Sequence, residues 1–266
     1  MARLPAIFVT HGGGPCFWMS FPEPFGPRAF DKLGDHFTHL LAGLPERPKA
    51  VLIISAHWEE DRPTIGTAAQ PGMLFDYYGF PPHTYELSYP AAGSPELAAK
   101  VKGLLEGAGI ACGTDDKRGF DHGVFVPMLM IDPNAGLPIT MLSLQKNLDP
   151  ARHLAIGAAL APLRDEGVLI IGSGSSFHNL RTYFNGAPGD AASFDTWLTE
   201  TVTKADGREQ RLVDWAQAPS ARACHPREEH LLPLMVTAGA AQGEAGHRVF
   251  HDLIGGKPMS GYSFGN

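Results

Sequence analysis

Histidines are the residues of this sequence whose placement most directly suggests chemistry. The chain of 266 residues contains 12 of them, and imidazole is both a common transition-metal ligand and the usual proton carrier near neutral pH. His11, His57 and His178 each follow a short, largely apolar run, at residues 6–10, 50–56 and 168–172. Their positions after such runs predict a shared metal or acid–base site.

The three runs predict buried β-strands. Each is apolar on both faces and ends at glycine or polar residues, which is typical of parallel strands covered by helices on both sides. Ligands of open α/β sheets bind where the carboxyl ends of the strands meet. One topology can therefore bring the three histidines to the same edge of the sheet. Further strands are expected at residues 110–113 and 138–144.

Helical segments alternate with these strands. They are expected at residues 30–44, 94–108 and 149–166, with Ser94 and Asp149 as caps, each followed by a proline. This alternation predicts a doubly wound α/β fold. We expect residues 1–266 to form a single domain with a mostly parallel central sheet and helices on both faces. The weakest segment, residues 185–193, has only the length of a loop.

His122 and His230 can complete the histidine group. His122 stands in the segment Gly-Phe-Asp-His-Gly, and by pattern alone it equally fits a turn, as His178 equally fits a helix start. His230 lies in a segment expected to be helical from residue 226 onward. Pro233 is expected to kink that helix, because it removes one backbone hydrogen bond, and to leave His230 on a distorted turn.

Glu228 and Glu229 would occupy the first turn of the same helix, where carboxylates suit the helix dipole. His225, just before it, is expected to cap the helix or face solvent. The other histidines have no comparable context, and we expect structural or exposed roles for His36, His39, His83, His153, His247 and His251.

Two glycine-rich loops offer weaker interpretations. Residues 12–14 suggest a phosphate cradle, but neither a Walker lysine nor a dinucleotide-binding spacing follows them. Residues 172–176 suggest a nucleophilic serine, but they lack the Gly-x-Ser-x-Gly spacing of a nucleophile elbow. Neither pattern competes with the histidine site.

Composition narrows the class of protein. Apolar residues make up 44% of the chain and charged residues 18%, which excludes intrinsic disorder. A net charge of -7 argues against a nucleic-acid groove. No apolar run approaches the roughly 18 residues that span a bilayer, and the first residues lack the pattern of a signal peptide. We expect a cytoplasmic protein with no membrane or nucleic-acid partner, whose three cysteines are reduced thiols.

Six motifs, in family order, resemble those of the class III extradiol ring-cleavage dioxygenases, and among them the 4,5-DOPA dioxygenase-like branch. They are residues 5–15 (PAIFVTHGGGP), 55–58 (SAHW), 76–81 (DYYGFP), 119–123 (GFDHG), 178–181 (HNLR) and 226–234 (PREEHLLPL). Each motif is weak alone, but together they cover most of the chain.

The resemblance implies a non-haem iron(II) enzyme that opens a catechol ring beside its two hydroxyls with O2. It implies His11, His57 and His230 as metal ligands. His178 would lie next to the metal as acid/base, and in some family members the matching histidine is itself a ligand. His122 would face the oxygen and substrate sites.

The sequence departs from the family pattern in two places. The first loop reads His-Gly-Gly-Gly-Pro where many relatives have His-Gly-Ser-Pro. The third ligand is a histidine, whereas better-known class III relatives supply a glutamate. A neutral three-histidine set is formally close to a catalytic zinc site. Fe(II) is therefore expected for activity, and Zn(II) is possible as a bound ion.

Catechol chemistry explains why such a site needs further histidines. Catechols are largely protonated at neutral pH, so binding one through both oxygens needs a base. Later steps need an acid, and one imidazole can serve in both roles. We expect His178 in this role, with His122 assisting. Residues 75–85, rich in aromatics, are expected to form the apolar wall and lid over the ring, although a packed surface loop is the alternative.

Two other functions remain open at this point. A zinc hydrolase would use the same histidines to activate water, and a non-catalytic metal-binding protein would leave no coordination position open. The expected partners are a small catecholic substrate and O2, bound to a monomer or a small homo-oligomer.

Overall fold

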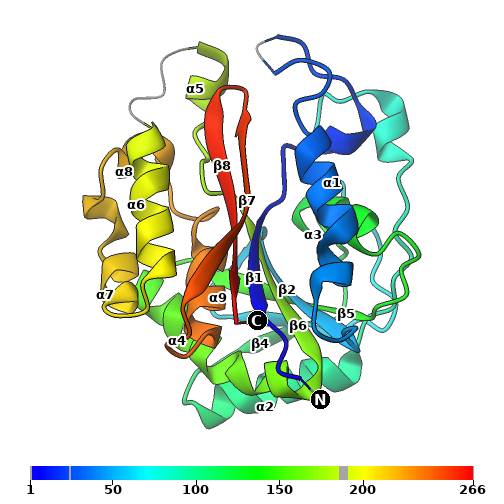
Figure 1. Ribbon diagram of the computed structural model, residues 1–266. Coiled ribbons are helices and arrows are strands. Elements are labelled where there is room, and N and C mark those ends of the chain that lie inside the picture. Colours follow the sequence, from blue (N-terminus) through cyan, green and yellow to red (C-terminus); the bar gives the residue numbers. More distant parts are fainter. Residues whose placement is uncertain (1, 24, 186–190, 266) are drawn as a thin grey trace.

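An eight-stranded mixed sheet runs through the centre of the molecule. The computed structural model describes residues 2–23, 25–185 and 191–265 (Figure 1). In spatial order the strands are β4 (Gly113–Asp115), β3 (Thr64–Gly66), β5 (Ile139–Gln145), β2 (Ala50–Glu60), β6 (Val168–Gly174), β1 (Ala6–Thr10), β8 (Lys257–Phe264) and β7 (Gly246–Ile254).

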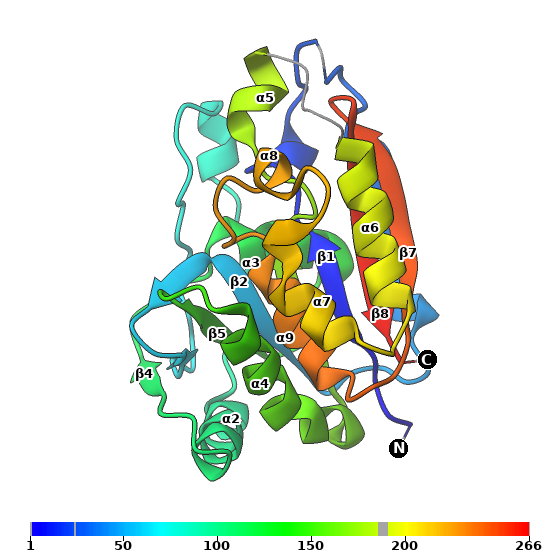
Figure 2. The ribbon, with the colours of Figure 1, turned by 90° about the vertical axis from the view of Figure 1, so that its left-hand side faces the viewer.

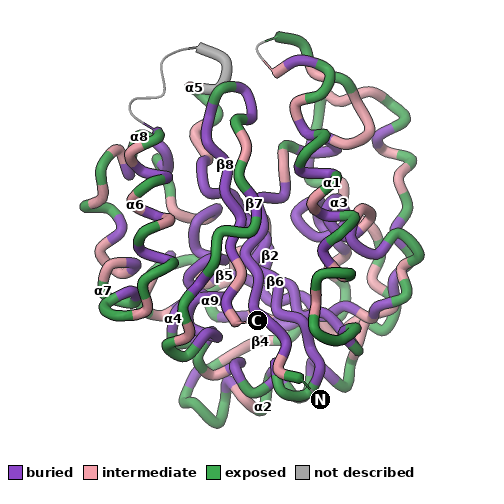
Figure 3. Tube along the Cα trace, in the orientation of Figure 1, coloured by how far each residue is buried: buried purple, intermediate pink, exposed green. Residues whose placement is uncertain are grey.

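The four central strands, β5, β2, β6 and β1, are parallel to one another. On one side β8 is antiparallel to β1, and β7 is antiparallel to β8; on the other side β3 is antiparallel to β5. Figure 3 shows that the central strands are buried, as their apolar sequences predict. Because β1, β2 and β6 are parallel, their carboxyl ends lie at the same edge of the sheet.

Helices cover both faces of this sheet (Figure 2). On one face α3 (His122–Ile131) packs on β2 and β6, and α1 (Asp31–Leu40) packs beside it, against α3 and β7. On the other face α9 (Leu232–Ala240) packs on β6, β1 and β2, and α4 (Pro150–Leu160) packs on α9. The expected α/β domain, mostly parallel with helices on both faces, is therefore confirmed.

The remaining helices lie around these layers. They are α2 (Pro95–Gly107), α5 (Leu180–Asn185), α6 (Ala191–Thr203), α7 (Arg208–Val213) and α8 (Ala221–Cys224). Short 3-10 turns occur at Cys16–Trp18, Leu41–Gly43, Pro82–Tyr85, Ala161–Glu166 and Trp215–Gln217. Within the described ranges, no helix is both long enough and apolar enough to cross a lipid bilayer.

Two glycines let α4 and α9 approach backbone to backbone. A Cβ atom at Gly157 would collide with the carbonyl oxygen of Val236, and one at Gly239 would collide with that of Leu154. The close approach holds α9 tightly between α4 and the sheet. It thereby fixes the turn at residues 229–231, which precedes α9 and carries His230.

The capped helices form where the sequence predicts them. The Ser94 side chain accepts a hydrogen bond from the Leu97 N–H, and Asp149 accepts from Ala151 and Arg152. The helix expected at residues 30–44 is α1 followed by a 3-10 turn, and that expected at residues 149–166 is α4 followed by another.

Several expectations about the elements were wrong. The strand predicted at residues 110–113 begins only at Gly113, as β4. The helix predicted from residue 226 begins at Leu232, so Pro233 stands in its first turn, where its missing N–H has no partner to lose, and it produces no kink. The hairpin of β7 and β8 was not anticipated. Of the loop expected at residues 185–193, residues 186–190 lie outside the described ranges, and α6 begins at Ala191.

Candidate metal centre

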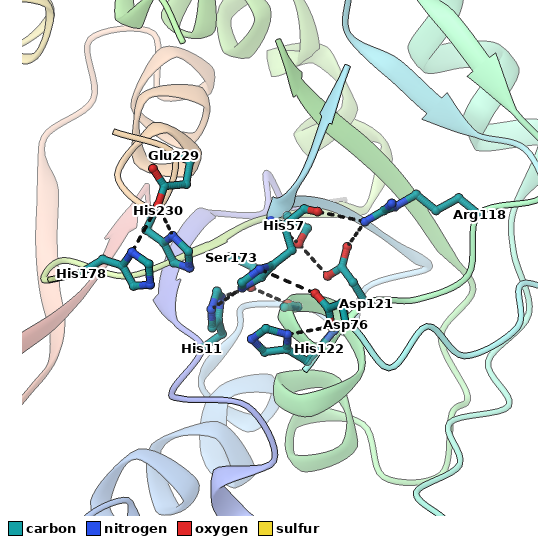
Figure 4. A network of polar contacts seen from close by, with 12 residues as sticks. His11, His57, Asp76, Arg118, Asp121, His122, Ser173, His178, Glu229 and His230 are labelled. Atoms are coloured by element: carbon teal, nitrogen blue, oxygen red, sulfur yellow. Dashed lines mark hydrogen bonds and ion pairs between the residues drawn. The ribbon is translucent and has the colours of Figure 1, made fainter. Parts of the chain in front are cut away.

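Five histidines meet at the carboxyl edge of the central strands, as the sequence predicts (Figure 4). The rings of His11, His57 and His230 lie with their centroids 4.8 to 5.3 Å apart. His122 is 3.9 Å from His57, and His178 stacks on His230 at 3.3 Å with an angle of 14° between the rings. Every histidine expected in the site is therefore in it.

Each strand-derived histidine has its own backbone support. His11 directly follows β1, and its N–H donates to the carbonyl of Gly174 at 3.0 Å. His57 lies inside β2 rather than after it, which corrects the expected position. The pairing of β2 with β5 shifts between Ser55 and Glu59, so His57 sits in a bulge, and bulges re-aim side chains next to active sites. Arg118 donates to the His57 carbonyl at 3.0 Å.

The other three histidines come from a helix start and two turns. His122 is the first residue of α3, not part of a turn, and its N–H donates to Asp76 Oδ1 at 2.9 Å. His178 reaches the site through the segment after β6. The His230 carbonyl accepts from the Ser175 N–H at 2.9 Å, and only a glycine at position 174 leaves room for that carbonyl.

The Nδ1 atom of every one of these rings faces an oxygen of the protein. The Ser173 hydroxyl donates to the Gly123 carbonyl, so it accepts from His11 Nδ1, at 3.1 Å. The other pairs are His57 with Asp76 Oδ2 (3.6 Å), His122 with Asp76 Oδ1 (2.7 Å), His230 with Glu229 Oε1 (3.0 Å) and His178 with Glu229 Oε1 (3.2 Å). The contacts of His11, His122, His178 and His230 favour the tautomer with the proton on Nδ1 and a free Nε2 lone pair, whereas the 3.6 Å contact of His57 is longer than a hydrogen bond and does not fix its tautomer.

The free nitrogens fit a metal ion. His11 Nε2 and His57 Nε2 lie 3.2 Å apart, so a single cation could bind both nitrogens in place of the contact between them. Burial lowers the pKa of His11 and His57 well below the ordinary value of 6.5 and that of His230 to about 3. Neutral imidazoles are the form that binds transition metals.

Two sets of three donors have all their ligand atoms within 4.8 Å of one another. One is His11, His57 and His122, and the other is His178, Glu229 and His230. The ligand set expected from the sequence, His11, His57 and His230, takes members from both. The cluster thus holds all five expected residues, with more donors than one ion needs from the protein.

Sequence reasoning missed the residues that orient the histidines. Asp76 lies inside a motif that was noticed, without a role. Glu229 was expected to face a helix dipole, but α9 begins three residues later, and Glu229 instead accepts from two histidines. Asp121, fully buried, accepts from Ser55 at 2.7 Å and from Arg118 at 2.9 Å behind the bulge of β2.

His225 also differs from its expected role. It was predicted to cap a helix or face solvent, yet it is fully buried, with Nε2 2.9 Å from the carbonyl of Ser176. Burial lowers its pKa from 6.5 to about 4. The residue is part of the packed interior behind the loop that carries His178.

A cleft of about 550 Å³ opens on the cluster. Its walls include His57, His178 and His230, together with Trp58, Arg118 and Leu180. A small aromatic ligand fits a volume of this order. The cleft therefore gives a ligand a route to three of the five histidines.

The aromatic segment at residues 75–85 packs next to the cluster. The Tyr77 ring lies 5.8 Å from that of His122, and the Tyr77 hydroxyl donates to the Thr84 carbonyl at 2.6 Å. Phe80 packs onto Gly14, where the backbone has φ +54° and an added Cβ would lie 2.9 Å from the ring. The segment supplies an apolar wall beside His122, and its role as a lid stays a prediction.

Comparisons with known proteins show that the chain is similar to aromatic ring-opening dioxygenases. The family described as the catalytic LigB subunit of aromatic ring-opening dioxygenase matches residues 22–264. A 4,5-DOPA dioxygenase extradiol of Beta vulgaris is 42% identical over 219 residues, 81% of this chain and 81% of that protein. One of Escherichia coli is 33% identical over 249 residues, 91% of this chain and 87% of that protein. The crystal structure of an uncharacterized Escherichia coli protein matches with a TM-score of 0.77 and 31% identity, covering 99% of this chain and 100% of that one.

Proposed function

Because the chain belongs to the LigB family of aromatic ring-opening dioxygenases, we propose that it is an iron(II)-dependent extradiol dioxygenase acting on a small, DOPA-like catechol. Membership makes it a ring-cleaving enzyme, which takes a small aromatic substrate and O2. Residues 1–266 would act as one catalytic domain. The observation that carries the metal assignment is the convergence of five imidazoles in two donor sets, in each of which all the donor atoms lie within 4.8 Å of one another.

We assign His11, His57 and His230 as the ligands of the ion. They come from three separate elements, and an oxygen of the protein faces the Nδ1 atom of each. His57 and His230 also line the cleft, so a catechol entering there would reach the same ion. His122, which shares a donor set with His11 and His57, is the alternative third ligand.

Bound iron(II) would supply a redox-active Lewis acid that holds catechol and O2 together, whereas zinc has no redox chemistry. The donor set suits either ion, because three neutral imidazoles are typical of zinc as well. Zn(II) is therefore a possible occupant of the isolated protein and an inactive one. Family membership argues against the zinc hydrolase that the sequence left open, because the matched family and relatives are ring-opening dioxygenases.

Proton transfer falls to His178 in this proposal. Its Nδ1 is engaged by Glu229, so its Nε2 is the atom that takes a proton from a catechol hydroxyl and later returns it. The side chain is 24% exposed and lines the cleft, where a substrate would lie. His122, engaged by Asp76 in the same manner, would assist on the side of the aromatic segment.

The decisive experiment compares the two metals. Apo-protein loaded with iron(II) under anaerobic conditions should consume O2 when a catechol from a panel is added, and zinc-loaded protein should not. Equal turnover with zinc, or hydrolysis that needs no O2, would overturn the dioxygenase assignment.

Alanine variants test the ligands separately. His11→Ala, His57→Ala and His230→Ala should each lose the metal in elemental analysis, while His39→Ala, an exposed control, should retain it. If His230→Ala keeps the metal and His122→Ala loses it, the alternative donor set is the correct one.

A further inference from the structure

Two carboxylates in the site are each shared by two histidines. Asp76 Oδ1 accepts a hydrogen bond from Nδ1 of His122 at 2.7 Å, and its Oδ2 lies 3.6 Å from Nδ1 of His57, within ion-pair range but beyond a hydrogen bond. Glu229 presents a single oxygen, Oε1, to Nδ1 of His230 at 3.0 Å and to Nδ1 of His178 at 3.2 Å. Figure 4 shows the second pair side by side beneath Glu229.

Both carboxylates are held in place by the surrounding protein. The side chain of Asp76 is 20% exposed and that of Glu229 is 13% exposed. The backbone N–H of His122 donates to Asp76. Arg227 lies 3.4 Å from Glu229 Oε2 and is itself anchored by two bonds of 2.5 Å to Glu59. These contacts support both carboxylates beside their histidines.

The two carboxylate-linked pairs of histidines combine the same two roles. In the proposed function each pair contains one metal ligand, His57 or His230, and one histidine that handles protons, His122 or His178. A carboxylate that accepts from Nδ1 fixes the tautomer and the orientation of a ring and makes its Nε2 a better base and ligand. Glu229 is within hydrogen-bond distance of both of its rings, whereas Asp76 accepts from His122 and acts on His57 through its charge at 3.6 Å.

We propose that Asp76 and Glu229 are positioning residues, each of which couples one metal-holding histidine to one proton-transferring histidine. The inference rests on the proposed function for the roles of the four histidines. It adds that the metal and the proton-transfer group cannot be adjusted independently, because the same oxygen, or the same carboxylate, orients both. Removing either carboxylate should therefore weaken both metal binding and turnover.

The first test measures the affinity of apo-protein for Zn²⁺ by competition with a chelator. Asp76→Asn and Glu229→Gln should each raise the dissociation constant about 10- to 100-fold, the usual effect of losing a partner of a ligating histidine. Visible spectra of the Co²⁺-loaded variants should shift, since the ligand orientation changes. The unfolding temperature of the apo-proteins should stay at the wild-type value.

Matched controls come from neighbouring carboxylates. Glu228 is adjacent to Glu229 and pairs with Arg222 at 2.7 Å. Asp61 pairs with Lys146 on the surface. Glu228→Gln and Asp61→Asn should leave the Zn²⁺ affinity and the Co²⁺ spectrum within twofold of wild type.

A double-mutant cycle tests the coupling itself. Glu229→Gln should lower kcat in the wild-type background but add little once His178 is already glutamine, because the loss then acts through an absent imidazole. Its effect on Zn²⁺ affinity should persist in that background, because it acts through His230.

Wild-type Zn²⁺ affinity and an unshifted Co²⁺ spectrum in both variants would overturn the proposal, as would an equal effect in the Glu228→Gln control. An effect in only one variant would refute the role of the other carboxylate. Additive losses of kcat in the cycle would refute the coupling. If no form consumes O2 with any catechol, the proposed function fails, while the Zn²⁺ and Co²⁺ measurements still decide whether the carboxylates position the ligands.

Discussion

Replacing His178 by glutamine separates proton transfer from metal binding at this site. His178 stacks on His230 with ring centroids 3.3 Å apart, and its Nδ1 lies 3.2 Å from Glu229 Oε1. Glutamine can keep a hydrogen bond to that carboxylate, but it cannot exchange a proton near neutral pH. His11, His57 and His230 are untouched by the change, so the variant should retain its iron.

The size of the effect distinguishes two roles. Loss of a single hydrogen bond costs about 0.5–1.5 kcal/mol, which corresponds to a rate loss of roughly 2- to 13-fold. Loss of a general acid/base costs on the order of 10²- to 10⁴-fold. The two ranges do not overlap, and a fall in kcat beyond about 100-fold therefore identifies His178 as the group that moves the proton.

The assay pairs iron content per chain with kcat at saturating catechol and O2. We expect near-stoichiometric iron and a kcat reduced by about 10²- to 10⁴-fold, with His39→Gln unchanged in both. Iron lost together with activity would make His178 a ligand of the ion. A kcat within about 13-fold of wild type would refute the acid/base role and transfer it to His122.

Three further predictions test the surroundings of the site. Ser173→Ala removes the oxygen that accepts from His11, so the Zn²⁺ dissociation constant should rise about tenfold or more in chelator competition. Gly157→Ala should lower the free energy of unfolding by about 1–3 kcal/mol in urea, because its Cβ would collide with α9, whereas Gly103→Ala, in open space on α2, should be neutral or stabilising by up to about 1 kcal/mol. His225 has a pKa of about 4 in the folded protein against about 6.5 unfolded, so the stability that it contributes is complete above pH 6.5 and is lost as the pH falls toward 4. Apo His225→Phe should therefore lose about 2 kcal/mol less than wild type between pH 7 and pH 5, and an identical loss would show that His225 takes up no proton on unfolding.

The edge of the sheet that carries the site could be predicted from the sequence for a physical reason. Strands buried on both faces must be apolar throughout, so the points where polar residues follow them are visible as breaks. His11 and His178 stand after two such breaks. The parallel arrangement then requires that the strands end at one edge, and the histidine cluster follows from it.

The remaining details depend on residues that are distant along the chain. His57 lies in a bulge because β2 changes its pairing with β5, some 85 residues away. Asp76 and His122 are 46 residues apart, and neither residue alone indicates the bond. From the sequence, Pro233 is compatible with a kink inside a helix or with the first turn of a helix. In the structure it stands in the first turn of α9, which packs closely on α4 and the sheet. Local patterns therefore locate the histidines of the cluster but not the groups that orient their rings.

The position of negative charge is the feature that sets this site apart from a facial triad of two histidines and a carboxylate. The assigned ligands are three neutral imidazoles, and the nearest carboxylates, Asp76 and Glu229, lie behind the rings at Nδ1. In the proposed function, a divalent cation held by these three imidazoles would keep its full charge toward the cleft, because no ligand would neutralise it directly. The carboxylates still favour the cation through the rings that they polarise. Such a site would favour a substrate that supplies negative charge itself, and in the proposed function a catechol that has given a proton to His178 would be such a substrate.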